Sequence, residues 1–203
     1  MEKKQQGNGE IRTGVLLMGI IACGGIFGWV YETLFYMYNY DGLIVKRGSC
    51  FGPWIDIYCL GGVLIYFVCR KMTDKPWLIF IVSGLLCGAL EYAAGFILDR
   101  VNGGHWGWNY NTEKLNFGNI HGYVCLRSVL VFAFSGLLLF YVMIPGLKWL
   151  QSKIGEKLFS RIFIVLGVII IADILYNDVA AYIFGLPSAS KIYFDLGWFP
   201  PIS

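Results

Sequence analysis

Residues 84–128 read GLLCGALEYAAGFILDR (84–100), VNGGHWGWNYNTEKLNFGN (101–119) and IHGYVCLRS (120–128). The first and last parts are apolar, yet they carry ionisable side chains, Glu91 and Arg127 respectively. The middle part is a loop rich in Gly, Trp, Tyr and Asn. A charge at the centre of a membrane helix costs about 2.5–3.5 kcal/mol on insertion scales, so it needs a partner. The pattern predicts a polar site between two membrane helices, covered by an aromatic loop.

The composition is that of an integral membrane protein. Of the 203 residues, 57% are hydrophobic and 14% are charged, and the mean hydropathy is +0.62. A soluble domain of this length is less apolar. Basic residues flank the apolar segments and form no patch with interleaved aromatics, so nucleic-acid binding is not expected. The P-loop motif G-x-x-x-x-G-K-[ST] and the common hydrolase motifs do not occur, which argues against ATP hydrolysis by that route.

Five apolar segments approach the length of about 20 residues that crosses a bilayer. We predict an all-α, polytopic bundle of about five transmembrane helices at residues 14–38, 53–70, 76–99, 121–144 and 158–183. Pro145-Gly146 is expected to end the fourth helix. The predicted organisation is a tail at 1–13, a bundle at 14–186 and an aromatic interfacial tail at 187–203.

Basic residues favour one orientation. Ten of them lie in the N-terminal tail and the loops 70–76 and 145–161, against five on the other side. Because cytoplasmic loops carry the excess of Lys and Arg, we predict a cytoplasmic N-terminus and an extracytoplasmic C-terminus. The loops 39–52 and 100–120 are then extracytoplasmic.

A short spacing recurs in the two outward hairpins. Phe51-Gly52 and Cys59-Leu60 reappear as Phe117-Gly118 and Cys125-Leu126 at the same separation. The recurrence suggests duplicated outward hairpins, a device known from transporters. Glycines spaced four apart in the first and third helices predict close helix contacts.

The ionisable residues within the predicted helices share one depth. In the predicted orientation they fall in the outer half of their helices: Glu32, Asp56, Glu91, Arg127, Asp173 and Asp178. We therefore predict an outward cavity with Arg127 as its central cation and Glu32 and Glu91 as its partners. Two interpretations stay open, a ligand site and a buried ion pair that only holds the bundle together.

The outer loops add further candidate ligand-binding residues. With Arg127, Glu91 and Glu32, the predicted set comprises Arg47, Trp106, Trp108, Tyr110, Asn116, His121 and Asp173. The aromatic members equally suit an interfacial belt. His121 and Cys125 are four apart on the predicted helix, but further ligands are lacking, so no metal or other cofactor is expected. A Cys59–Cys125 disulfide is a further expectation.

Several stretches together carry a family resemblance: they are Gly28-Trp29-Val30-Tyr31-Glu32, Lys46-Arg47-Gly48, Gly52-Pro53, Ile57-Tyr58, Gly88-Ala89-Leu90-Glu91-Tyr92, Trp108-Asn109-Tyr110, Leu115-Asn116, Gly122, Cys125-Leu126 and Ser128. In order and spacing they resemble the putative ABC-transporter type IV permease family of CmpB-like bacterial membrane proteins. The similarity covers about residues 14–145. Two family motifs, W-D-Y-S and P-I-Y-G, depart here to Trp108-Asn109-Tyr110-Asn111 and Asp56-Ile57-Tyr58-Cys59. The resemblance implies a multi-pass protein of the bacterial cytoplasmic membrane and a partner ATPase.

The leading hypothesis is a permease-like or substrate-capture protein for a small polar or anionic molecule or a lipid headgroup. It would act as a homodimer or with a partner ATPase or membrane subunit. A membrane-embedded enzyme acting on lipid or lipoprotein at the outer leaflet is an alternative, with His121 or Glu91 as base and Arg127 as anion stabiliser. A non-catalytic accessory subunit is another. Because no nucleophile–base pair stands out, an enzyme is the less favoured class.

Overall fold

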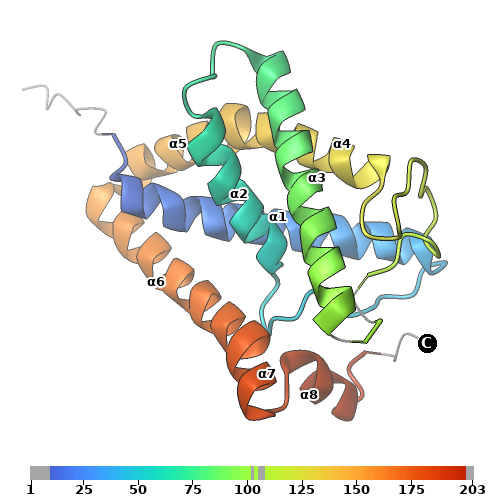
Figure 1. Cartoon of the computed structure of the whole chain (residues 1–203). Helices are drawn as coiled ribbons and strands as arrows, with labels where there is room; N and C mark the ends of the chain where they lie inside the picture. Colours follow the sequence, from blue (N-terminus) through green and yellow to red (C-terminus); the bar gives the residue numbers. More distant parts are fainter. Residues whose placement is uncertain (1–9, 102, 105–107, 200–203) are drawn as a thin grey trace, which may run out of the picture.

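The computed structural model describes residues 10–101, 103–104 and 108–199 and folds them into helices (Figure 1). They are α1 (Thr13–Asn39), α2 (Asp56–Cys69), α3 (Pro76–Val101), α4 (Leu126–Leu138), η1 (Leu139–Met143), α5 (Ile144–Ile154), α6 (Glu156–Ile174), η2 (Leu175–Ala180), α7 (Ala181–Phe184) and α8 (Ala189–Asp195), where η marks a π-helical turn. In this described part, β pairing is confined to a bridge between Ile120 and Val124. The predicted all-α architecture is confirmed.

Four continuous helical rods are long and apolar enough to cross a membrane. Within the described residues they are Thr13–Asn39, Pro76–Val101, Leu126–Ile154 and Glu156–Phe184. The predicted span 53–70 is represented by α2, whose 14 residues rise only about 21 Å, less than the ~30 Å of hydrocarbon. The bundle therefore has four candidate spans and one shorter apolar helix.

The helix predicted at 121–144 begins later than expected. His121 and Gly122 have φ values of 57° and 78°, which a right-handed helix excludes. The helix therefore starts at Leu126. Arg127 consequently lies in its first turn, not within the body of a membrane span.

The same helix also continues further than expected. Pro145 lacks an N–H and its ring crowds the carbonyl four residues earlier, but the π-helical turn η1 directly precedes α5. The wider spacing of a π turn accommodates this strain. The rod ends at Gly155, whose φ is 86°. The predicted end at Pro145-Gly146 is wrong.

Close helix contacts build the bundle. Helix α3 packs most extensively on α4, and α1 packs on α2 and α6. A Cβ on Gly88 would lie 2.9 Å from a Val129 methyl group, and one on Gly28 would lie 2.2 Å from the Tyr58 ring. The glycines thus bring backbones together as predicted, and fully buried side chains such as Ile20 and Phe159 fill the interior.

The two predicted outer loops share one end of the bundle. The Lys114 amide donates to Asn39 Oδ1 at the end of α1, at 2.8 Å. Figure 1 shows the yellow-green segment before α4 packed beside this light-blue end of α1. This arrangement places side chains of both loops against the ends of α1 and α4.

The residues whose matched spacing suggested duplicated hairpins lie in different local structures. Cys59 is the fourth residue of α2, whereas Cys125 is the N-cap of α4. The Phe51 carbonyl accepts from the Tyr193 hydroxyl, whereas that of Phe117 accepts from the Leu126 amide. The matched spacing therefore has no common local geometry at these positions.

Candidate functional site

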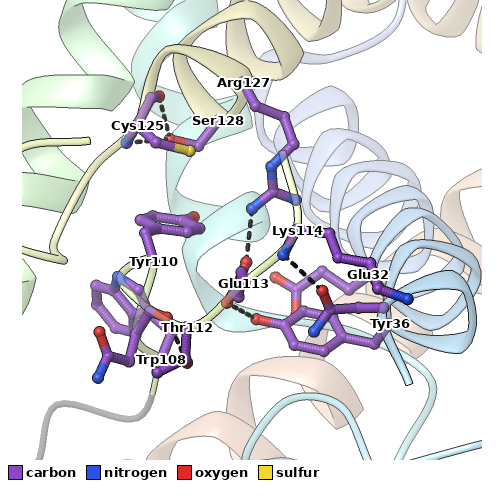
Figure 2. Close-up of polar contacts among 12 residues, drawn as sticks. Glu32, Tyr36, Trp108, Tyr110, Thr112, Glu113, Lys114, Cys125, Arg127 and Ser128 are labelled. Atoms are coloured by element: carbon purple, nitrogen blue, oxygen red, sulfur yellow. Dashed lines mark hydrogen bonds and ion pairs between the residues drawn. The ribbon is translucent and has the colours of Figure 1, made fainter. Parts of the chain in front are cut away.

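A carboxylate from the loop before α4 connects α1 with α4. Arg127 Nη2 lies 2.6 Å from Glu113 Oε2, and the Tyr36 hydroxyl of α1 donates to Glu113 Oε1. Figure 2 shows Glu113 between the guanidinium and the phenol, with both contacts drawn. The side chains of Arg127 and Glu113 are only 11% and 4% exposed. The charged group is therefore closed to solvent in this structure.

Two aromatic rings lie over the guanidinium of Arg127. Its Cζ is 3.7 Å from the centroid of the Phe35 ring and 5.2 Å from that of Tyr110, within the range of cation–π attraction. Nη1 makes a long 3.4 Å contact with the Tyr31 hydroxyl. Nε is buried with no hydrogen-bond partner among the described residues. A buried donor without an acceptor costs about 1–3 kcal/mol, so this nitrogen is an unused binding group.

A second arginine completes the charged cluster. Arg47 Nε and Nη2 donate to Glu32 Oε2 at 2.9 and 2.7 Å, and its Cζ lies 3.4 Å above the Tyr36 ring. Tyr36 thus contacts Arg47 with its ring and Glu113 with its hydroxyl. The predicted pairing of Arg127 with Glu32 is wrong, because segment 40–55 folds back along α1 and brings Arg47 to Glu32.

Glu91 is held by hydroxyl groups. The Tyr110 hydroxyl donates to Oε1 at 2.6 Å, and Ser128 Oγ lies 2.6 Å from Oε2. The predicted pairing of Glu91 with Arg127 is therefore also wrong, and Tyr110 lies between them. Burial raises the pKa of Tyr110 well above its ordinary value. Tyr110 accordingly remains a hydrogen donor.

The two short contacts of Ser128 favour a protonated Glu91. Ser128 Oγ lies 2.8 Å from the Cys125 carbonyl as well as 2.6 Å from Glu91 Oε2, and it accepts from the Cys125 amide at 3.3 Å. A hydroxyl has a single hydrogen. Both short contacts are satisfied together when Glu91 is protonated and donates to Ser128.

Residues 108–125, here called the cap loop, fold back on themselves. The Trp108 indole donates to the Tyr123 carbonyl at 2.9 Å, and the Tyr110 amide donates to Gly122 at 3.1 Å. Asn109 Oδ1 accepts from the Asn111 amide at 3.0 Å. Asn109 thus provides a side-chain acceptor within the turn. The cap loop is an internally bonded unit.

Polar contacts attach the cap loop to α1. Glu113 reaches Tyr36, as described above. Lys114 Nζ lies 2.8 Å from Asp41 Oδ1 and 3.2 Å from the Tyr38 carbonyl, where a cation also complements the carboxyl end of a helix. The Lys114 contacts are solvent-exposed, so they add little stability.

Asp173 lies in a different polar cluster. It accepts from the amides of Phe51 and Gly52, both at 3.0 Å, and from the Trp54 indole at 2.9 Å. Asn177 Nδ2 donates to it at 2.7 Å. Asp173 therefore anchors the segment before α2 to α6, which gives it a structural role.

The remaining predicted residues contribute less. His121 is exposed and its Nδ1 lies 2.9 Å from the Tyr92 hydroxyl. Asn116 contributes its carbonyl to a turn with the Asn119 amide. Trp106 lies outside the described residues. No group of three potential metal ligands occurs among the described residues.

The expected disulfide and the expected helical pairing of His121 with Cys125 are wrong. All six cysteines are free, and Cys59 Sγ donates to the Ile21 carbonyl. His121 lies in a turn before the helix, as its positive φ requires.

Three residues of the site, Glu113, Tyr36 and Phe35, were not among those predicted from the sequence. Glu113 is the only acidic residue of 101–119. Since Arg127 was predicted to need an acidic partner, this loop offered Glu113 as a candidate. Tyr36 follows Glu32 by four residues, so both lie on one helix face. Phe35 carried no signal of its own.

A family model described as "Putative ABC-transporter type IV" matches residues 20–177. The matched region contains the entire charged cluster and the cap loop. No curated protein and no solved structure shows a significant match.

Proposed function

This chain belongs to the putative ABC-transporter type IV family, and we propose that it is a permease-like or substrate-capture protein whose site binds a small polar or anionic molecule or a lipid headgroup. The site consists of Arg127, Glu113, Tyr36, Arg47 and Glu32. The cap loop closes it in the state described here and opens to admit the ligand.

The unused Nε of Arg127 carries this proposal. A guanidinium that served only as a structural link would be expected to have its buried donors satisfied, as Arg47 does through two bonds to Glu32. Arg127 instead keeps a buried donor free among the described residues. Intramembrane and membrane-edge cations of this kind commonly mark a ligand path.

The excess of basic residues in the opposite loops supports an outward-facing site, with the N-terminus in the cytoplasm. The family description favours a partner ATPase, because the chain itself has no P-loop motif. A homodimer or a second membrane subunit would supply the helices that the four long rods and the shorter α2 lack for alternating access. Membrane lipid surrounds the bundle and is itself a candidate ligand.

The test is binding by purified protein in lipid nanodiscs. Intrinsic Trp fluorescence and thermal unfolding would be followed with a panel of anionic, zwitterionic and neutral solutes, and native mass spectrometry would identify retained lipids. We expect wild type to respond to at least one anionic or zwitterionic member and Arg127→Gln to lose the response. The matched control is Arg161→Gln, since Arg161 is exposed on α6.

Equal responses of wild type and Arg127→Gln, with both variants folded, would show that the cluster is only a structural ion pair. Correct assembly that depends on Arg127 without any ligand response would point to an accessory subunit.

A further inference from the structure

We propose that Glu113 occupies the position of the ligand's own anionic group, so that the ligand is a carboxylate or phosphate oxyanion and Glu113 is its tethered competitor. This inference rests on the proposed function and specifies its ligand class. It is carried by the way in which Arg127 and Tyr36 bind Glu113.

The donors that bind Glu113 belong to helices, whereas Glu113 belongs to the cap loop. Arg127 lies on α4 and Tyr36 on α1, and each donates to a different oxygen of the carboxylate. If the cap loop lifts, both donors stay in place. A guanidinium left without its counter-charge is strongly unfavourable in a dry site. An incoming oxyanion can replace the carboxylate on the same two donors.

Glu113 uses the guanidinium incompletely. It accepts from Nη2 of Arg127, while Nε, on the same edge of the guanidinium, remains buried and unpartnered among the described residues. Arg47 shows the complete arrangement, because its Nε and Nη2 both donate to Glu32. Carboxylates and phosphates bind arginine through two such bonds. A free oxyanion can therefore take both nitrogens of Arg127, which the tethered carboxylate does not.

The surroundings limit the ligand group to a compact anion. Phe35 and Tyr110 lie over the guanidinium, so a ligand anion would bind along its edge, where Glu113 lies. Arg47 is already neutralised by Glu32. A single negative charge therefore replaces Glu113 without changing the charge of the cluster. A free carboxylate solute, inorganic phosphate and a lipid phosphate share this chemistry.

The test compares wild type with Glu113→Gln, which keeps the size of the side chain and removes its charge. Binding of inorganic phosphate and of acetate would be measured by thermal unfolding in neutral phosphatidylcholine nanodiscs. Lipid phosphate would be tested separately by retention of phosphatidylglycerol in native mass spectrometry. We expect Glu113→Gln to bind one of these oxyanions about 10- to 100-fold more tightly than wild type, the ratio expected for a charge-assisted hydrogen bond. Adding Arg127→Gln should abolish the gain.

Two further variants provide a second test and a control. Glu113→Asp shortens the reach to Tyr36 and should give a smaller gain, which provides a test if Glu113→Gln folds poorly. Asp41→Asn breaks the exposed Lys114 contact of the same loop and should leave the affinity unchanged. An equal gain in Asp41→Asn would mean that loosening the loop, not removing the competitor, causes the effect.

The outcomes separate the inference from the proposed function. If wild type binds in an Arg127-dependent way and no Glu113 variant binds more tightly, Glu113 is not a competitor of the ligand. The proposed binding site would still stand. Binding that is confined to neutral or cationic solutes would overturn the oxyanion class. The absence of Arg127-dependent binding in every variant would overturn both.

Discussion

The hydrogen bonds of Glu91 indicate its protonation state. Its carboxyl group contacts the hydroxyls of Tyr110 and Ser128, and each short contact of Ser128 has its own hydrogen when Glu91 carries a proton. An amide can reproduce this pattern, because a glutamine donates to Ser128 and accepts from Tyr110.

We therefore predict that Glu91→Gln assembles at wild-type levels, whereas Glu91→Ala unfolds at a lower temperature because it leaves the buried Tyr110 hydroxyl without its acceptor. The loss is about 1–3 kcal/mol for this unsatisfied group. Thermal unfolding in detergent measures it.

Infrared difference spectroscopy of wild type against Glu91→Gln provides the direct check. The wild-type spectrum should contain the C=O stretch of a protonated carboxylic acid, and the variant should lack it. Appearance of a carboxylate band in its place would contradict the protonated state.

Two π-helical turns determine how the long rods run. The turn η1 carries the helix through Pro145, and η2 surrounds Asn177, whose side chain bonds the carbonyl of Asp173 at 3.0 Å. A side chain that enters the helical hydrogen-bond ladder distorts it in this way. Asn177 Oδ1 also accepts from the Ala189 amide at 2.7 Å. This hydrogen bond attaches the start of α8 to the π-helical turn.

At the level of elements, Asp173 decides how the segment before α2 is attached to α6. It accepts from three donors of that segment, two backbone amides and the Trp54 indole. We predict that Asp173→Asn lowers Tm, because the amide turns one acceptor into a donor facing a donor. The expected loss is about 1–3 kcal/mol.

The control for this prediction is Asp195→Asn, which removes the exposed pair with Lys191 and should cost little. Thermal unfolding of the two variants side by side makes the comparison. Equal Tm values would show that Asp173 does not anchor the segment.

For the whole molecule, the orientation in the membrane is the remaining prediction. We expect Lys191→Cys to react with a membrane-impermeant maleimide in intact cells and Asp74→Cys to react only after permeabilisation, because the basic loops are predicted to face the cytoplasm. Both positions are exposed, and five of the six native cysteines are buried. The reverse labelling would place the cap loop in the cytoplasm.

The apolar composition and the segment lengths by themselves determined a helical membrane bundle, because hydrocarbon admits only helices or closed barrels. The same sequence identified Arg127, Glu91 and Glu32 as costly residues that need partners. Only the tertiary structure decided the pairing. Glu113 reaches Arg127 and Arg47 reaches Glu32 because two loops fold back onto the end of α1, and contacts between segments distant along the chain leave no periodic signal in the sequence.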